Sequence, residues 1–224
     1  MPVSEHVSSC PEFTTISQEF RDEYVIEKSR FITTLYPCST EDEAQAFITR
    51  INKEFWDARH NCTAFALGPK QEQQRSSDNG EPSGTAGKPM LEVLKKTGIT
   101  NIAVVVTRYF GGIKLGAGGL IRAYSHSVSE ALKKAPKELH TTRMQLQTNV
   151  DYATFGTIER YLTDQQYTFT KEFSDTVTLT ILLPQEDLEP LKKQLQDITS
   201  GAVNFEELGF SEVTIPITMD TAPS

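Results

Sequence analysis

The feature that most constrains the fold is a glycine-rich segment that closely follows a run of apolar residues. Ile102–Val106 is continuously apolar, as in a strand that is buried on both faces. Shortly after it, five of nine consecutive positions are glycine: Gly111, Gly112, Gly116, Gly118 and Gly119. Glycine reaches backbone conformations that are closed to other residues, so we expect a tight loop here. The apolar spacing that begins at Leu120 then predicts a helix.

Earlier in the chain, the patterns predict two strands, a helix, a third strand and a second helix. β-Branched and aromatic residues mark the strands, and capping side chains followed by apolar residues at helical spacing mark the first helix. The predicted ranges, in order, are Asp22–Ser29, Arg30–Pro37, 40–54, Asn61–Leu67 and Pro89–Lys96. Before the second helix lies Gly68–Gly87, a polar stretch for which we expect no regular structure and high mobility. Loops of this length are commonly functional.

A linker is expected at Lys133–Glu138, and a second domain after it. The patterns there predict a strand, a helix, two strands, a helix and a strand, at Arg143–Val150, Tyr152–Gln165, Tyr167–Phe173, Thr176–Leu183, Gln185–Ile198 and within Val203–Ile217. This is the order of the ferredoxin-like, split βαβ arrangement. A length of 224 residues favours two domains, which we place at 1–135 and 139–224. The expected fold class is α+β.

Charge is distributed unevenly along the chain. Residues 1–139 contain 17 Lys and Arg against 17 Asp and Glu, whereas residues 140–224 contain 5 against 13. The whole net charge of −8 therefore arises in the last third. Because proteins contact phosphates largely through cations, any contact with nucleic acid is expected in the first part.

Cysteine usage and hydropathy indicate the compartment. Cys10, Cys38 and Cys62 are unevenly spaced and form no Cys-x-x-Cys pair, so we expect neither a disulfide framework nor a zinc site. No apolar run is long enough to cross a membrane, and the start lacks the basic and apolar segments of a signal peptide. We therefore expect a cytoplasmic protein with no membrane partner, no metal and no cofactor.

The glycine-rich loop is the best candidate for a binding site. The free N–H groups and the dipole at a helix start favour an anion, and the stretch from Arg108 to Tyr124 has three cations and no acid. Phosphate is the natural ligand of such a stretch, although tight packing of the loop explains the glycines equally well. Gly118 is expected to need either a left-handed backbone or close approach of the ligand. The predicted phosphate-binding residues are Arg108, Gly111, Gly112, Lys114, Gly116, Gly118, Gly119 and Arg122.

Four further residues are accessory candidates: His60, Asp78, Glu81 and Tyr109. His60 and Cys62 share one face of a strand, which allows a Cys–His nucleophile or a buried cysteine beside a hydrogen-bonded histidine. Asp78 and Glu81 are suited to holding a divalent ion, to acid–base chemistry, or to turns and caps. Tyr109 and its neighbour Phe110 either stack on bases or close the core beneath the loop.

Four blocks of the sequence carry a resemblance to a known family. Arg108–Ser125, Ser77–Pro89, His60–Ala64 and Lys28–Phe31 are similar to the signature segments of the YigZ/IMPACT family. Most members carry a second acid where Asn79 stands here. This departure weakens any role that needs two adjacent carboxylates.

The resemblance implies both a fold and a functional context. It implies an N-terminal β-α domain like domain IV of elongation factor G and, in bacterial members, a ferredoxin-like C-terminal domain similar to domain V of that factor. Eukaryotic IMPACT members regulate translation under amino-acid starvation by binding a protein partner of the kinase that senses uncharged tRNA. Bacterial members lack the N-terminal module associated with that binding.

Two functional hypotheses follow. The first is a non-catalytic protein that binds RNA, the ribosome or a translation-associated protein through the Arg108–Arg122 loop and acts in translation or stress regulation. The alternative is a hydrolase, of peptidase or phosphate-ester type, that uses Asp78, Glu81, His60 and Lys114. The sequence contains no His-Glu-x-x-His and no Gly-x-Ser-x-Gly segment, so binding is the preferred hypothesis.

Overall fold

The computed structural model describes residues 11–217, and this part of the chain is α+β with two sheets and five α-helices. It divides into two compact units. The first unit contains Glu12–His140 and residues 214–217, and the second contains Thr141–Val213. Cys10 lies outside the described residues; Cys38 and Cys62 are buried free thiols.

The first unit is built on a five-stranded sheet in which all neighbouring strands are antiparallel. Its strands, in spatial order, are β2 (Phe20–Ile26), β3 (Ser29–Pro37), β6 (Ile102–Tyr109), β4 (His60–Leu67) and β5 (Gln73–Ser77). The central strand β6 therefore hydrogen-bonds on both sides. Its carboxyl end carries Arg108 and Tyr109 toward the glycine-rich loop.

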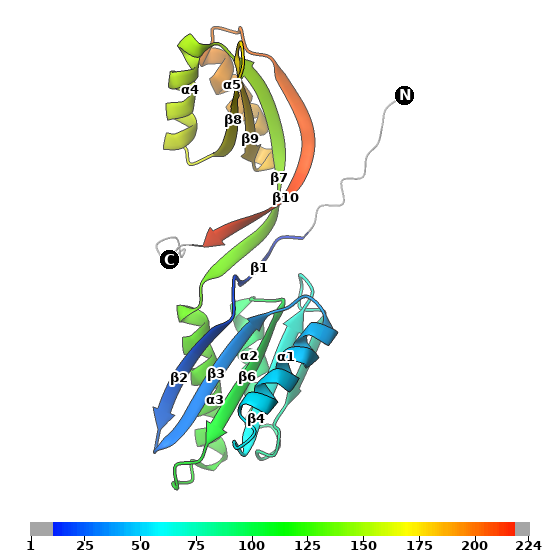
Figure 1. Cartoon of the computed structure of the whole chain (residues 1–224), viewed down its shortest axis with the longest axis vertical. Helices are drawn as coiled ribbons and strands as arrows, with labels where there is room; N and C mark the ends of the chain where they lie inside the picture. Colours follow the sequence, from blue (N-terminus) through cyan, green and yellow to red (C-terminus); the bar gives the residue numbers. More distant parts are fainter. Residues whose placement is uncertain (1–10, 218–224) are drawn as a thin grey trace. The chain divides into compact units, whose positions relative to one another are not determined.

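Helices cover both faces of this sheet (Figure 1). Helix α1 (Glu41–Glu54) packs on one face with Ala103 and Val105 of β6. Helices α2 (Gly87–Thr97) and α3 (Gly116–Lys134) pack on the other with Val104 and Val106. Alternate residues of β6 thus enter two different cores, which explains why this strand is apolar at every position.

The predicted structureless stretch contains a strand, so that part of the prediction was wrong. β5 lies within Gly68–Gly87 and pairs with β4 from Leu67↔Gln73 to Thr63↔Ser77. All five of its side chains are exposed. Backbone hydrogen bonds at the sheet edge hold β5 in place, and such bonds leave no apolar periodicity in the sequence. A further unpredicted strand, β1 (Phe13–Ile16), lies in the polar leader and pairs with residues 137–140 of β7.

The second unit follows the predicted order of strand, helix, strand, strand, helix, strand. Its elements are β7 (Lys137–Val150), α4 (Tyr152–Asp164), β8 (Thr168–Phe173), β9 (Val177–Leu183), α5 (Leu188–Ile198) and β10 (Phe205–Ile217), with a short 3-10 turn at Gln185–Asp187. The first residues of β7 and the last residues of β10 belong to the first unit. The strands are arranged β10-β7-β9-β8. β7 begins before the predicted strand, because its first residues pair with β1 in the first unit.

The core of the second unit lies between this sheet and its two helices. Along β9, buried residues alternate with less buried ones, as in a strand that packs on one face only. Buried leucines of α5 and Ile158 and Leu162 of α4 join the same cluster. Asp151 caps α4, because its Oδ1 accepts a hydrogen bond of 2.7 Å from the Thr154 N–H.

Within residues 11–217, no helix is both long enough and apolar enough to cross a membrane.

We expect residues 139–224 to fold when expressed alone, because the second unit has a hydrophobic cluster of its own. Urea unfolding followed by circular dichroism should show one cooperative transition. Leu179→Ala in that segment should lower its free energy of unfolding by about 2–5 kcal/mol, since Leu179 is completely buried. A gradual, non-cooperative loss of signal would contradict this prediction.

Candidate functional site

The candidate site lies where β6 ends and α3 begins. The glycines there have different physical roles. An added Cβ on Gly111 would lie 2.0 Å from the carbonyl carbon of Lys28, and the Gly111 N–H donates to Ser29 Oγ at 3.1 Å. Gly111 therefore lets the loop pack directly against the turn between β2 and β3. At Gly112 the backbone φ is +89°, a left-handed conformation that favours glycine.

Gly116, Gly118 and Gly119 belong to α3, which begins earlier than the sequence predicts. Gly116 has a φ of +69°, whereas Gly118 is not in the left-handed region. A Cβ at Gly118 would meet only the Nη1 atom of Arg122, at 3.7 Å. The expectation of a left-handed backbone at Gly118 was wrong, because this residue lies in the first turn of a helix.

The start of α3 has no side-chain cap. Its N-cap residue, Leu115, makes no side-chain hydrogen bond, and the first turn contains no acidic residue. The first N–H groups of an α-helix have no partner within the helix. This end of α3 therefore presents backbone donors to whatever approaches it.

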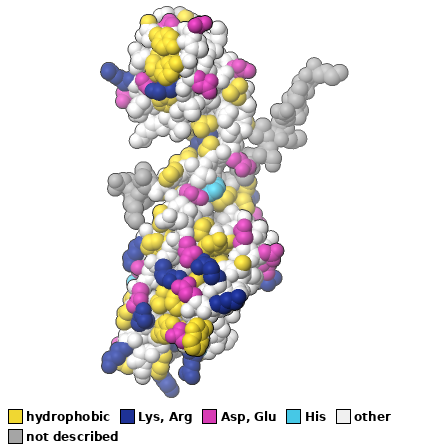
Figure 2. Space-filling view, viewed as in Figure 1, with side chains coloured by type: hydrophobic (Ala, Val, Ile, Leu, Met, Phe, Trp, Pro, Cys, Tyr) yellow, Lys and Arg dark blue, Asp and Glu magenta, His cyan; other side chains and the backbone are white. Residues whose placement is uncertain are grey.

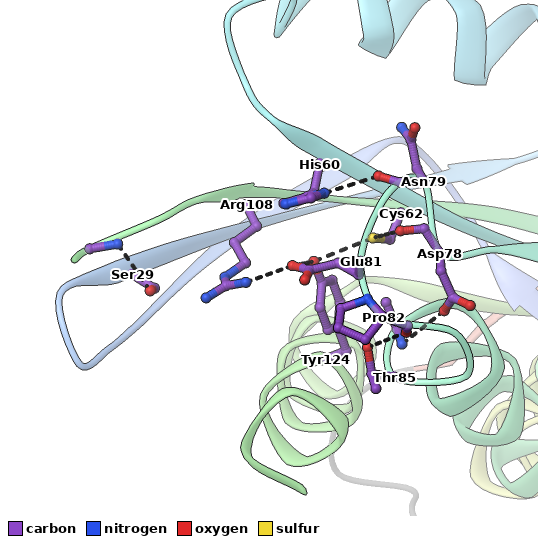
Figure 3. Close-up of polar contacts among 12 residues, drawn as sticks. Ser29, His60, Cys62, Asp78, Asn79, Glu81, Pro82, Thr85, Arg108 and Tyr124 are labelled. Atoms are coloured by element: carbon purple, nitrogen blue, oxygen red, sulfur yellow. Dashed lines mark hydrogen bonds and ion pairs between the residues drawn. The ribbon is translucent and has the colours of Figure 1, made fainter. Parts of the chain in front are cut away.

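Arg108 differs from the other two predicted cations because it is buried. Its Nη1 lies 2.7 Å from Glu81 Oε1, and the two side chains are only 7% and 3% exposed (Figure 3). Lys114 and Arg122 are both exposed. Arg108 thus differs from Lys114 and Arg122 in having an internal partner, which its charge needs once it is removed from water.

Glu81 also connects this ion pair to α3, where Tyr124 in turn lies beside Cys62 of β4. Its Oε1 accepts a second hydrogen bond, of 2.9 Å, from the Tyr124 hydroxyl. Cys62 Sγ lies 2.9 Å from the Asp78 carbonyl oxygen and 3.3 Å from Tyr124 Oη. The thiol has one proton, so it donates a hydrogen bond to only one of these oxygens at a time. Figure 3 shows these side chains meeting between β4, β6 and α3.

The Cys–His nucleophile interpretation does not fit this geometry. Burial raises the pKa of Cys62 to about 12, so the thiol stays protonated at neutral pH. The His60 ring is not placed to take a proton from Cys62 through Nδ1, because this nitrogen lies 3.0 Å from the Asn79 carbonyl oxygen. The alternative interpretation, a buried cysteine with a hydrogen-bonded histidine nearby, describes both residues.

Asp78 stabilises the loop before α2. Its Oδ2 accepts from the Gly84 N–H at 2.7 Å, and its Oδ1 accepts from the N–H groups of Ala86 and Gly87 at 3.0 and 2.8 Å. Burial alone would raise the pKa of this carboxyl, but the three N–H donors outweigh it and hold the pKa below its usual value. Asp78 therefore acts as a cap for the start of α2. Among the described residues, no group of three or more His, Cys, Asp or Glu is placed to hold a metal ion.

Asn79 has a local structural role that an acid could not fill. Its backbone has a φ of +39°, which asparagine tolerates better than most residues. Its side-chain Nδ2 donates to the Asn61 carbonyl oxygen at 2.9 Å. A carboxylate has no proton to donate there, so the amide links this turn to β4.

The rings of Tyr109 and Phe110 differ in how accessible they are to a ligand. The Tyr109 hydroxyl donates to Asp57 Oδ1 at 2.8 Å, and burial together with Asp57 raises the pKa of this phenol. Phe110 is 50% exposed and lies over the Arg108 guanidinium, with 5.6 Å from Cζ to the ring centre. Of the two, Phe110 is the ring that a ligand can reach. Trp56, which the sequence patterns did not single out, is also exposed.

Two hollows flank the loop. One, of about 320 Å³, is lined by residues that include Arg59, Glu81, Arg108, Phe110, Leu115 and Gly116. The other, of about 580 Å³, is lined by residues that include Tyr24, Glu27, Ile113, Lys114, Arg122 and His126. The structure thus brings Arg108, Glu81, His60 and Lys114 to one hollow, while Asp78 and Tyr109 do not line it. Arg59 and Leu115 were missed, since neither stands out in the sequence.

Comparisons with known proteins give the family. The Impact N-terminal domain matches residues 27–132, and the Domain of unknown function (DUF1949) matches residues 148–202. IMPACT family member YvyE from Bacillus subtilis (strain 168) is 43% identical over 196 residues, which cover 87% of this chain and 90% of that protein. The chain belongs to the YigZ/IMPACT family.

Other relatives extend the comparison. IMPACT family member YigZ from Escherichia coli (strain K12) is 36% identical over 183 residues, covering 80% of this chain and 90% of that protein. Protein IMPACT from Rattus norvegicus is 32% identical over 94 residues, covering 40% of this chain and 29% of that protein. One solved structure, described as a crystal structure of a hypothetical protein, is similar with a TM-score of 0.57 at 33% identity and covers 87% of this chain and 96% of its own.

We expect Arg108→Met to lower the free energy of unfolding by about 3–5 kcal/mol, because Glu81 would be left buried without its cation. The double variant Glu81→Gln/Arg108→Met should recover most of this loss, since glutamine keeps an oxygen for the Tyr124 hydroxyl. Urea unfolding measures both. Arg75→Met, which breaks an exposed pair with Glu41, is the control and should change stability by less than about 1 kcal/mol. Equal losses in the single and double variants would contradict the prediction.

Asp78→Asn should cost about 1–3 kcal/mol at pH 7, because an amide cannot accept all three backbone donors. The pKa of Asp78 is lowered in the folded protein. The contribution of Asp78 to the free energy of unfolding is therefore present above the unfolded pKa of about 3.9. It is lost as the pH falls through the pKa of Asp78 in the folded protein. The difference between wild type and variant should shrink accordingly in unfolding measurements below about pH 4. Asp164→Asn, at an exposed helix end, is the control for the removal of one carboxylate.

Proposed function

We propose that this YigZ/IMPACT-family protein is a non-catalytic protein that binds RNA or the ribosome, or a translation-associated protein, and acts in translation or stress regulation. Membership of the family fits a translation-related regulatory role. Binding through the loop from Arg108 to Arg122 is the specific part of the proposal. RNA is the partner that the charges of this loop favour.

The observation that carries the proposal is the combination of exposed cations with an uncapped helix start. Lys114 and Arg122 are exposed on either side of the first turn of α3, which has no acidic residue. Figure 2 shows Lys and Arg side chains at the end of the first unit, where the β2–β3 turn and the loop after β6 lie. Cations and free N–H groups together suit the phosphates of a nucleic acid.

The fold assignments form part of the same proposal. The β-α-β-β-α-β order and the strand arrangement β10-β7-β9-β8 support a ferredoxin-like second domain within 139–224. The first domain, within 1–135, is proposed to be similar to domain IV of elongation factor G. We further propose that the protein is cytoplasmic and works beside the translation machinery.

No observation favours the hydrolase alternative. Asp78 uses both carboxylate oxygens on backbone N–H groups, and Glu81 is occupied by Arg108 and Tyr124. His60 is held by the carbonyl of Asn79. The residues proposed for acid–base chemistry are thus already engaged in the structure of the loop.

Replacing Lys114 and Arg122 together by alanine should weaken RNA binding with little effect on the fold. Exposed substitutions change stability by about 0.5 kcal/mol. The log–log dependence of RNA affinity on salt should become flatter by roughly one for each lost phosphate contact. Fluorescence anisotropy with a labelled oligoribonucleotide over a series of salt concentrations measures this slope.

The matched control is Lys53→Ala/Lys96→Ala, which removes two exposed cations from the last turn of α1 and from α2. This control has the same net charge as the test variant. If both double variants lose affinity equally, a diffuse charge effect replaces the proposed site. If neither variant loses affinity, the loop is not the binding surface.

A further inference from the structure

The hollow of about 320 Å³ beside the start of α3 has features that surface cations alone do not explain. Part of its wall is apolar, and includes Pro82, Phe110 and Leu120. Its polar groups come from the start of β4, the loop before α2, the end of β6 and the beginning of α3. A small group with an apolar neighbour therefore fits it better than a stretch of backbone phosphates does.

The first unexplained feature is the guanidinium of Arg108. Only its Nη1 meets Glu81, and its Nε is buried with no hydrogen-bond partner among the described residues. Leaving a buried donor without a partner is costly. Nε and Nη2 form the edge of a guanidinium that binds two oxygens of an oxyanion side by side. Phe110, half exposed, lies over this guanidinium, and both residues line the hollow.

The second feature is the backbone at Leu115 and Gly116. Leu115 is right-handed, with φ of −78° and ψ of −20°, and Gly116 follows with a φ of +69°. Successive residues of opposite hand turn their N–H groups into one concavity, a nest that binds anions. Leu115, Gly116 and Ala117 all line the same hollow as Arg108. The dipole of α3 adds to the attraction, because this is its amino end.

The charges around the hollow also favour an anion. Arg59, Arg108 and Lys114 line it, and Glu81 is the acid that lines it with them. Because Glu81 is already paired with Arg108, two cationic side chains remain without an acid of their own in the lining. Both Arg59 and Lys114 are exposed, so they lie toward the mouth.

We propose that this hollow binds a terminal phosphate, that is, a phosphomonoester of a nucleotide or of an RNA end. Three sets of donors surround it: the Arg108 edge, the nest at Leu115–Ala117, and Lys114. A monoester offers three terminal oxygens to three such sets, whereas a phosphate inside an RNA strand offers only two. Phe110 provides a ring on which the adjoining base stacks. The inference rests on the proposed RNA-binding function and specifies which part of an RNA the site selects.

The experiment compares two short oligouridylates of the same sequence, one with a 5′-phosphate and one with a 5′-hydroxyl. The full-length protein should bind the 5′-phosphate form about tenfold more tightly, the effect of one charge-assisted hydrogen-bonded contact. Uridine 5′-monophosphate and inorganic phosphate are titrated separately by calorimetry. If uridine 5′-monophosphate also displaces the 5′-phosphorylated oligouridylate, a free nucleotide is a sufficient ligand and the rest of the RNA is not needed.

Ala117→Pro tests the nest without changing any charge. Proline removes one N–H group, and the first turn of a helix tolerates it. This variant should lose the preference for the 5′-phosphate, while Ala117→Gly, which keeps the N–H, should retain it. Arg108→Lys is the second test, because it leaves a cation beside Glu81 but lacks the Nε–Nη2 edge. Melting temperatures show whether each variant is folded.

The outcomes separate this inference from the proposed function. Equal binding of both oligouridylates by the wild-type protein, or an unchanged preference in Ala117→Pro and Arg108→Lys, overturns the phosphate pocket and leaves RNA binding in place. Binding of uridine 5′-monophosphate that is lost in Ala117→Pro, with no binding of either oligouridylate, supports the pocket and overturns RNA binding.

Discussion

The ion pair between Arg108 and Glu81 is the interaction on which the arrangement of this end of the first unit depends. It joins the carboxyl end of β6 to the loop before α2, and Tyr124 adds α3 through the same Glu81 oxygen. Removing two charges from water is costly, and a buried pair is stable only when its geometry and further hydrogen bonds are good. Removing either residue alone would leave the other charge buried without its partner, so the two residues depend on each other.

The cations and the glycines of this segment have different roles in the structure. Arg108 is buried and paired with Glu81, whereas Lys114 and Arg122 are exposed to solvent. Among the glycines, Gly111 is needed for contact with the β2–β3 turn, whereas Gly116 sets the backbone at the helix start. A segment that looks uniform in sequence thus performs two tasks, packing on one side and presenting donors on the other.

The sequence predicts well those elements whose apolar residues repeat with a regular period. The apolar run of β6 and the order of elements in the second unit follow from such patterns. β5 could not be predicted, because it is fully exposed and is held by backbone bonds to β4. The early start of α3 was missed because glycine is a poor helix former, so the three glycines of its first turn gave no helical signal in the sequence.

The candidate site was predictable in position but not in its internal contacts. Arg108 and Glu81 are 27 positions apart, and Asp78 caps a helix that starts nine residues later. Neither relation leaves a local signal, since each depends on how distant segments meet. Charge in the sequence shows which residues are ionised, whereas only the fold shows which of those charges are neutralised by a neighbour.

The position of Trp56 has a practical consequence. It is the single tryptophan of the chain and is 82% exposed, just before Asp57, whose carboxylate receives the Tyr109 hydroxyl at the end of β6. Indole emission shifts to shorter wavelength when water around the ring is replaced by a less polar environment. Ultraviolet excitation of the unlabelled protein therefore reports on molecules that cover this end of the sheet, with no dye and no engineered residue to disturb it.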